Sequence, residues 1–156
     1  MPKPAKRLRI CLTASAGGHL SQLLRLSDSW KGHEIFYITT KDIVSQQLKS
    51  KGKVYIVGEC NRQHPLRVLA VLGRCARAIL HEKPQVVIST GAAAGCMACF
   101  WGKLFGARVA WIDSITNVDR ISLSGRLTKH IADLFIVQWP ELTRKYKNVK
   151  YIGYLI

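Results

Sequence analysis

Short apolar runs recur along the chain, and segments with helical periodicity separate them. Runs such as Gln85–Thr90 and Leu134–Gln138 are apolar without strict alternation, which is typical of strands covered on both faces. Strands and helices that alternate in this way favour an α/β fold with a mostly parallel, doubly wound sheet. The expected strands are Leu8–Ala14, Glu34–Thr40, Lys53–Val57, Gln85–Thr90, Arg108–Asp113 and Leu134–Gln138. The expected helices are Leu20–Trp30, Ile43–Ser50, Pro65–His81, Gly95–Phe105, Ser122–Ile131 and Pro140–Tyr146.

The length of 156 residues predicts a single domain, 1–156, and no Pro-, Gly- or Ser-rich linker interrupts it. A hydrophobic content of 48% excludes a disordered chain. Apolar runs stay short of the ~20 residues that span a bilayer, so we expect that the chain does not cross a membrane by itself. In a doubly wound sheet, ligands bind at the carboxyl ends of the strands, near the switch in strand order.

The first expected strand ends in the turn Ser15-Ala-Gly-Gly-His19. Gly17 and Gly18 let the backbone approach a ligand closely, and the N-terminus of the following helix attracts phosphate. Ser15, Gly17 and Gly18 are therefore candidate substrate-binding residues, while His19 adds a proton-transfer group. The alternative is a tight structural turn without a ligand. Because the turn is not G-x-G-x-x-G, it does not predict dinucleotide binding.

A second glycine-containing turn, Ser89–Gly95, occupies the equivalent position after the fourth expected strand. Two such turns at the carboxyl edge of one sheet predict a shared crevice, and Gly91 joins the candidate substrate-binding residues. The fifth expected strand ends at Asp113, whose carboxylate reaches the same edge. Asp113 either caps a helix or contacts a ligand, and the sequence leaves both roles open.

Basic residues greatly outnumber acidic ones: 24 Lys and Arg stand against 9 Asp and Glu, a formal net charge of +15. Such an excess indicates a polyanionic partner, although a generally basic solvated surface is the alternative. A nucleic-acid-binding domain would show aromatics interleaved in a basic groove or a recognition helix, and neither is visible, so we expect no nucleic-acid partner. The basic clusters are Lys3, Lys6, Arg7 and Arg9; Arg62, Arg67, Arg74 and Arg77; and Arg144, Lys145, Lys147 and Lys150.

The expected helix Pro65–His81 combines basic and apolar surface in unusual proportion. At 100° per residue its basic residues share an arc of about 80°, and apolar residues fill most of the remaining circle. This pattern is typical of a helix at a lipid interface, or of one buried between the sheet and a partner protein. The candidate membrane residues are Arg67, Leu69, Leu72, Arg74 and Arg77.

Five cysteines, an odd number, and the lack of a secretory signal favour a reduced cytosolic protein. Cys96 and Cys99 have the spacing of a zinc or redox pair, but no second ligand pair accompanies them. Small packed core residues are therefore the preferred interpretation. We expect neither a metal nor a bound cofactor.

Several segments together resemble one protein family across nearly the whole chain. They are the loop containing His19, the run KPQVVISTGAAAG, the segment Ser122–Arg126 and the run Phe135–Leu142. The family is the acceptor-side, membrane-associated subunit of split glycosyltransferases, and the chain resembles its bacterial PssD/EpsE-type members of exopolysaccharide and capsule assembly. In eukaryotes that subunit joins a catalytic partner to add the second N-acetylglucosamine to dolichol-linked sugar. The family is also similar to the N-terminal half of MurG-like GT-B enzymes, in which two Rossmann-like domains enclose a cleft.

The resemblance implies a Rossmann-like half of a GT-B glycosyltransferase, inactive or weakly active alone. It implies a separate donor-binding subunit that holds the UDP-sugar, a lipid-diphosphate-linked saccharide acceptor and an anionic membrane surface as partners. The eukaryotic subunit has an N-terminal transmembrane helix where this chain has MPKPAKRLR, so we expect a peripheral bacterial protein on the cytoplasmic face of the inner membrane. Trp139, Pro140, Tyr154 and Leu155 either dock the donor-binding subunit or pack on their own sheet.

In this family context, the two glycine turns would face the diphosphate-sugar of the acceptor, with Arg120 or Arg126 adding charge-assisted hydrogen bonds. Inverting sugar transfer requires a base for the attacking hydroxyl, and His19 and Asp113 both have suitable chemistry. The competing interpretation is a basic nucleic-acid-binding or nucleotide-binding α/β protein without transferase activity.

Overall fold

The computed structural model describes residues 6–60 and 63–154. Lys3, Arg62 and Leu155, which the sequence singled out, lie outside these ranges. The strands are β1 (Arg9–Thr13), β2 (Glu34–Thr39), β3 (Lys53–Ile56), β4 (Val86–Ser89), β5 (Arg108–Ile112), β6 (Leu134–Val137) and β7 (Lys150–Tyr151). The α-helices are α1 (Gly18–Arg25), α2 (Ser45–Lys49), α3 (Pro65–Glu82), α4 (Ala92–Leu104), α5 (Leu123–Thr128) and α6 (Glu141–Lys145). Two short 3-10 helices are η1 (Ser27–Trp30) and η2 (Asp42–Val44).

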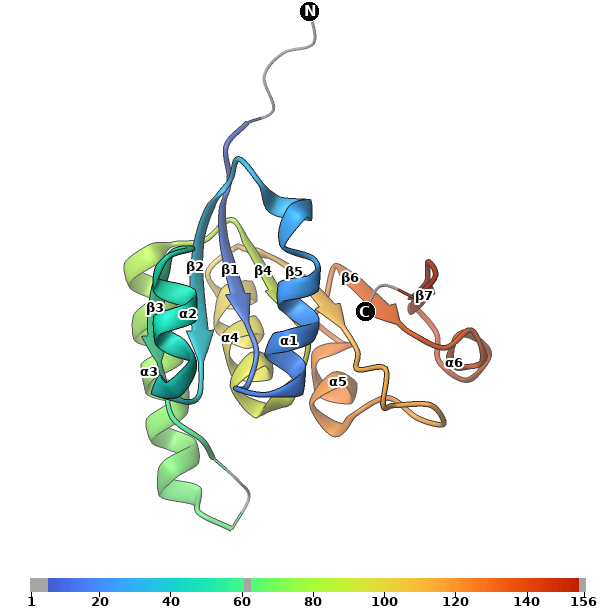
Figure 1. The fold of residues 1–156 in the computed structure, drawn as a ribbon. Helices are drawn as coiled ribbons and strands as arrows, with labels where there is room; N and C mark the ends of the chain where they lie inside the picture. The colour runs from blue at the N-terminus through green and yellow to red at the C-terminus, as the bar shows by residue number, and fades with distance from the viewer. Residues whose placement is uncertain (1–5, 61–62, 155–156) are drawn as a thin grey trace, which may run out of the picture.

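The strands of the described chain form one seven-stranded parallel sheet in the order β3-β2-β1-β4-β5-β6-β7 (Figure 1). The order reverses between β1 and β4, so this central pair marks the switch point of a doubly wound sheet. In the register, Cys11 of β1 lies between Phe36 of β2 and Val87 of β4, and all three side chains are buried. The predicted Rossmann-like α/β fold is confirmed.

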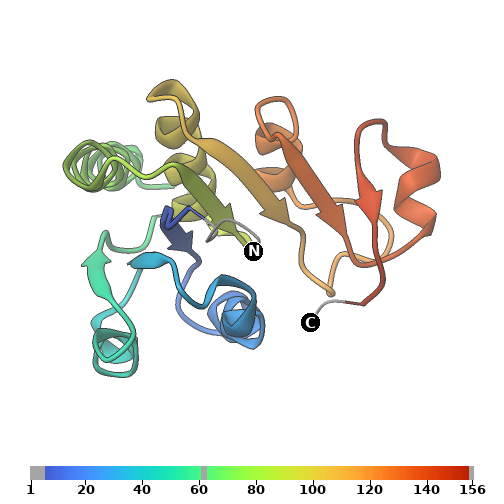
Figure 2. The same cartoon turned by 90° about the horizontal axis from the view of Figure 1, so that it is seen from above.

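Helices cover both faces of the sheet: α3, α4 and α5 lie on one face, and α1 and α2 on the other (Figure 2). Strand β1 shows why its sequence is apolar at nearly every position. Ile10 and Leu12 pack with Leu20 and Leu23 of α1, whereas Cys11 between them packs in the core under α3 and α4. A strand covered on both faces has no side that can carry polar residues without burying them.

The predicted strands agree with the structure to within one residue at each end, whereas the helix boundaries differ more. Helix α4 begins three residues before its predicted start, because Gly91 caps it and both Ala93 and Ala94 are strong helix formers. The predicted helix Leu20–Trp30 is α1 followed by the separate turn η1, where Ser27–Ser29 are weak helix formers. Helices α2, α5 and α6 are shorter than predicted. Strand β7 was not predicted, because a strand of two residues is too short to show a sequence pattern.

Helix α3 agrees with the predicted segment and extends it by one residue, to Glu82. Its buried face consists of Val71, Cys75, Ala78 and Ile79. The N-terminal half of α3 projects past the edge of the sheet at which the strands end (Figure 1). Side chains at this end of α3 therefore lie beside the edge where ligands bind in this fold class.

Candidate functional site

The two glycine turns occupy matching positions on either side of the switch point. Gly17 is the N-cap of α1 with a φ of 111°, and Gly91 is the N-cap of α4 with a φ of 141°. Both values lie in the region that favours glycine. Neither glycine has a side chain to cap its helix, so the first backbone N–H groups of α1 and α4 point out from the carboxyl edge.

Reciprocal hydrogen bonds join the two turns. The Nδ1 atom of His19 lies 2.9 Å from the carbonyl oxygen of Thr90, and the Thr90 hydroxyl donates to the carbonyl oxygen of His19 at 2.6 Å. The His19 ring also packs directly on Gly91, because a Cβ at that position would lie 2.6 Å from ring atoms. The two turns that the sequence predicted to share a crevice are thus held together by what we call the His19–Thr90 latch.

The latch fixes where the His19 ring carries its proton. A carbonyl oxygen can only accept a hydrogen bond, so Nδ1 is the protonated nitrogen. In the neutral ring, Nε2 then keeps its lone pair and is the atom that can accept a proton. The His19 side chain is half-buried at the edge of the domain rather than in its core.

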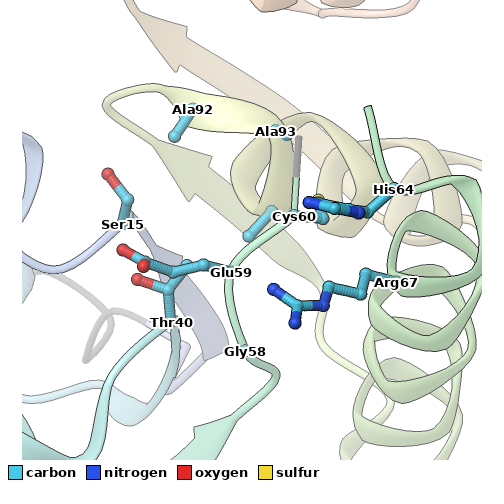
Figure 3. Close-up of a pocket in the computed structure, with 10 residues that line it drawn as sticks. Ser15, Thr40, Gly58, Glu59, Cys60, His64, Arg67, Ala92 and Ala93 are labelled. Atoms are coloured by element: carbon cyan, nitrogen blue, oxygen red, sulfur yellow. The ribbon is translucent and has the colours of Figure 1, made fainter. Parts of the chain in front are cut away.

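A polar cavity of about 310 Å³ lies at this edge (Figure 3). Ser15 and Thr40, which follow β1 and β2, line one side of it. His64 and Arg67, at the start of α3, point into it from the other side. The segment Gly58–Cys60 after β3 and the first turn of α4, Ala92–Ala94, complete the cavity. Five separate groups of residues therefore converge on one space beside the switch point.

The charges around the polar cavity suit an anion. The exposed Arg67 guanidinium has no acidic partner among the described residues. Glu59 is the acidic residue of the lining, and its carboxylate forms an ion pair with Lys41 at 3.1 Å. The positive end of the 13-residue helix α4 adds to the field of Arg67.

Sequence reasoning found part of this site. Ser15 lines the cavity, and Gly17, Gly18 and Gly91 form the adjoining turns without lining it. Arg67, which the sequence assigned to membrane contact, also lines the cavity. Thr40, His64 and the segment Gly58–Cys60 also line the cavity and were not predicted. Thr40 directly follows β2, so the rule that polar groups at strand ends meet at one edge would have found it. His64 has no such signal.

Asp113 is buried beneath the loop between β5 and α5 and does not line the cavity. Its carboxylate accepts hydrogen bonds from the Trp111 indole at 3.1 Å, the Asn117 amide at 3.0 Å, and the hydroxyl and backbone N–H of Ser122 at 2.9 and 3.2 Å. Ser122 is the N-cap of α5, and its hydroxyl accepts from the N–H of Gly125. The geometry therefore favours a structural role, in which Asp113 orients the residue that caps α5.

Arg120 and Arg126 are exposed, in the β5–α5 loop and on α5, and neither lines the polar cavity. The loop itself reaches toward the first turn, since the Gln22 amide of α1 donates to the Ser114 hydroxyl at 3.3 Å. The structure therefore leaves both arginines near the carboxyl edge but outside the cavity, where they can contact only a ligand that extends beyond it.

Most of the candidate membrane residues on α3 are exposed. Leu69 is 62% exposed, and Leu66, one turn earlier on the projecting end, is 80% exposed. Leu72 was expected to face the membrane but is half-buried. Its carbonyl oxygen accepts a hydrogen bond from the Trp101 indole of α4 at 3.0 Å. Arg74 is tied to the end of β3 by donating to the Val57 carbonyl oxygen at 3.0 Å. The exposed candidates are Arg67, Leu69, Arg74 and Arg77.

The C-terminal aromatic residues pack on their own domain only in part. Trp139 is half-buried and donates from Nε1 to the Ile115 carbonyl oxygen at 2.8 Å. Its ring meets Tyr154 edge to face, with centroids 5.7 Å apart. Tyr154 is nevertheless 61% exposed, and Ile152 is 60% exposed. One end of this aromatic cluster packs on its own domain, and the other end is uncovered.

The cysteines fit the interpretation as packed residues. Cys99 is fully buried in the core and Cys96 is half-buried on α4, and burial raises the pKa of both thiols. Within the described ranges, no group of three or more His, Cys, Asp or Glu side chains is arranged to hold a metal ion. Across the same residues, no helix is both long enough and apolar enough to span a bilayer.

Comparison with known proteins decides the family. A family model described as "Oligosaccharide biosynthesis protein Alg14 like" matches residues 10–155. The chain belongs to the Alg14-like family. Similar curated proteins include the UDP-N-acetylglucosamine transferase subunit ALG14 of Yarrowia lipolytica, at 28% identity over 95% of this chain and 81% of that protein. The human subunit of the same name is 26% identical, over 98% of this chain and 85% of its own length. That of Eremothecium gossypii is 35% identical, over 53% of this chain and 40% of its own length.

Solved structures share the Alg14-like fold at low identity. MurG of Acinetobacter baumannii superposes with a TM-score of 0.76 at 14% identity, over 92% of this chain and 45% of MurG. UDP-N-acetylglucosamine 2-epimerase of Rickettsia bellii gives a TM-score of 0.70 at 14% identity, over 96% of this chain and 46% of the epimerase. The chain thus spans a little under half the length of each. What they share is the fold, a Rossmann-like half of the kind found in GT-B glycosyltransferases.

Proposed function

We propose that this chain is the acceptor-binding subunit of a two-component glycosyltransferase, which transfers a sugar from a UDP-sugar to a lipid-diphosphate-linked acceptor. The polar cavity at the switch point carries the proposal, because an arginine and the start of α4 meet there in about 310 Å³. Family membership supports the reaction class, since the ALG14 relatives are named as subunits of UDP-N-acetylglucosamine transferases.

The acceptor diphosphate is the group that fits the polar cavity. Arg67 forms charge-assisted hydrogen bonds with phosphate oxygens. The uncapped N–H groups of Ala92–Ala94 donate to the same oxygens, and the Ser15 hydroxyl donates from the opposite side. The Lys41 ion pair keeps the Glu59 carboxylate from opposing the anion. The sugar attached to the diphosphate then extends toward the His19–Thr90 latch.

His19 is the better placed of the two candidate bases. When the acceptor hydroxyl attacks the anomeric carbon of the donor sugar, the new glycosidic bond forms, the bond to UDP breaks and the hydroxyl proton must leave. Nε2 of His19 takes that proton, because Nδ1 is already committed to Thr90. Asp113 is buried, and four donors occupy its carboxylate.

The UDP-sugar is bound by a separate subunit in this proposal, because the ALG14 relatives are named as subunits of a UDP-N-acetylglucosamine transferase. The exposed side chains of Ile152 and Tyr154 supply apolar surface for docking that subunit. Peripheral attachment to an anionic cytoplasmic membrane surface uses the projecting end of α3. The setting in capsule or exopolysaccharide assembly remains a prediction from the sequence resemblance, and the relatives described above are fungal and human proteins.

The test is a transfer assay with membranes that bear lipid-linked acceptor and with radiolabelled UDP-sugars. This chain, a candidate donor-binding subunit and the mixture of the two are each assayed. Strong transfer by the mixture alone is the expected result, and it also identifies the sugar. Transfer by the candidate alone that the chain does not increase would refute the proposal.

His19→Asn probes the base within the same assay. The asparagine amide keeps a donor near the position of Nδ1, but nothing replaces Nε2 as proton acceptor. We expect kcat to fall about 100-fold or more with KM little changed. Thr90→Val is the matched control, because it removes one bond of the latch and leaves Nε2 in place. Equal kcat for the two variants would remove His19 as the base.

A further inference from the structure

A second cavity, of about 450 Å³, adjoins the polar cavity and has the opposite character. It is a trough on the outer surface of the helical layer formed by α3, α4 and α5. Helix α4 supplies the floor, and α3 and α5 supply the walls. We call it the apolar trough, and its principal lining residues are Val68, Ala93, Cys96, Met97, Leu123 and Leu127.

The trough follows from the unequal size of side chains along the helical layer. The first four residues of α4 are Ala92-Ala-Ala-Gly95. Their side chains are small, so the outer surface of the helix is low there. On α5, by contrast, Leu123 and Leu127 lie one turn apart and rise beside it. Leu123 is 41% exposed and Leu127 is 61% exposed. Two adjacent leucines that wall a groove and contribute little to the core indicate a surface that an apolar group covers.

The two cavities adjoin each other, because Cys60 and Ala93 line both of them. One end of the combined site presents the Arg67 guanidinium and the start of α4, and the other presents only apolar or weakly polar side chains. Both volumes fall within the ~300–1,000 Å³ of small-molecule sites. This arrangement is complementary to an anion that carries a hydrocarbon chain.

We propose that the apolar trough holds the first part of the hydrocarbon chain of a lipid diphosphate whose diphosphate occupies the polar cavity. The inference rests on the proposed function and adds a binding site for the lipid itself. A protein partner would need apolar side chains in the trough but no anionic group beside Arg67, so the shared lining favours the lipid. The hydrocarbon of the lipid leaves the trough along Val68, which is next to the exposed Leu69. At this point α3 is proposed to meet the membrane.

Three probes separate binding of the diphosphate from binding of the hydrocarbon in experiments on this chain alone. They are farnesyl diphosphate, inorganic diphosphate and farnesol. We expect farnesyl diphosphate to bind at least about tenfold more tightly than inorganic diphosphate, because burying about two methylenes already gives that ratio. Arg67→Gln weakens the binding of both diphosphates. Equal affinity for farnesyl and inorganic diphosphate would overturn the proposal.

The cysteines report where each probe lies. Cys96 lines only the trough, Cys60 lines both cavities, and Cys11, Cys75 and Cys99 are buried internal controls. Burial raises the pKa of Cys60 and Cys96, so alkylation is followed by mass spectrometry at mildly alkaline pH. Farnesyl diphosphate should protect Cys60 and Cys96, whereas inorganic diphosphate should protect Cys60 alone. Reactivity of Cys96 that farnesyl diphosphate leaves unchanged would make the trough a protein-docking surface and end the proposal.

Leucine-to-serine variants test the walls. Leu123→Ser combined with Leu127→Ser should bring the affinity for farnesyl diphosphate down to that for inorganic diphosphate, without changing the latter. The matched control is Leu80→Ser combined with Leu104→Ser, two leucines that are 49% and 60% exposed and lie outside the trough. Equal effects of the two pairs would contradict the assignment. These binding measurements need no partner. If the lipid diphosphate binds as expected but no sugar transfer is detected, only the proposed function is refuted.

Discussion

Replacing Gly91 with alanine tests the latch at the centre of the site. Gly91 has a φ of 141°, and a Cβ there would lie 2.6 Å from Cε1 and Nδ1 of His19. The substitution therefore has two costs. The backbone is strained in a conformation that L-residues rarely adopt, and the imidazole must move away from Thr90. Moving the ring breaks the contact of Nδ1 with the Thr90 carbonyl oxygen and disturbs the reciprocal hydroxyl bond.

The expected loss in the free energy of unfolding is about 3 kcal/mol. Backbone strain accounts for about 1–2 kcal/mol. Losing two hydrogen bonds adds about 2 kcal/mol in all, while the smaller entropy of the unfolded alanine chain returns about 0.4–1 kcal/mol. For a domain of this size the sum corresponds to a fall of about 6–12 °C in Tm.

The assay is urea unfolding at constant m-value, with two other glycines as controls. Gly17→Ala has a comparable φ, 111°, but open space around its Cβ, so it should lose only about 1 kcal/mol. Gly18→Ala has neither cost and should be neutral or slightly stabilising. In a double-mutant cycle, His19→Ala should reduce the cost of Gly91→Ala to that of Gly17→Ala. Equal losses for Gly17→Ala and Gly91→Ala in the parent chain would refute the reasoning.

Three further predictions concern other parts of the chain. Asp113→Asn should lower the free energy of unfolding by about 2–3 kcal/mol, because an amide cannot accept from all four donors; a large loss of kcat at unchanged Tm would instead make Asp113 the base. Burial and the 2.5 Å bond to Glu82 raise the pKa of Tyr55 to about 12 from an unfolded value of 10.0. Its contribution to stability is therefore complete below pH 10 and lost as the pH rises through about 12. Tyr55→Phe should lower the free energy of unfolding by about 2 kcal/mol at neutral pH and reduce its decrease at alkaline pH, as measured by urea titration. An unchanged alkaline decrease would contradict the hydrogen bond between Tyr55 and Glu82. Leu66→Ser combined with Leu69→Ser should lower binding to anionic vesicles about tenfold or more in flotation assays, whereas unchanged flotation would exclude the end of α3 as the contact.

The order of the elements and the general position of the site follow from local sequence pattern. A parallel strand covered on both faces must be apolar at almost every position, so Gln85–Thr90 and Leu134–Gln138 could be located to within one residue. Gly17 and Gly91 follow such strands, and parallel strands end at one edge, so the meeting of their turns could be predicted as well. Helix ends were less predictable, because caps and weak helix formers decide them residue by residue.

Only the tertiary structure decided which side chains meet at that edge and what each one does. His19 and Thr90 are 71 residues apart, and no spacing rule connects an imidazole to a carbonyl oxygen at that separation. Asp113 ends a strand, as a ligand-contacting residue would, yet its carboxylate is directed to the cap of α5. The trough depends on helices of unequal side-chain size lying side by side. Pattern along the chain determines which surfaces are buried, but hydrogen-bond partners and cavities depend on side-chain directions that packing alone sets.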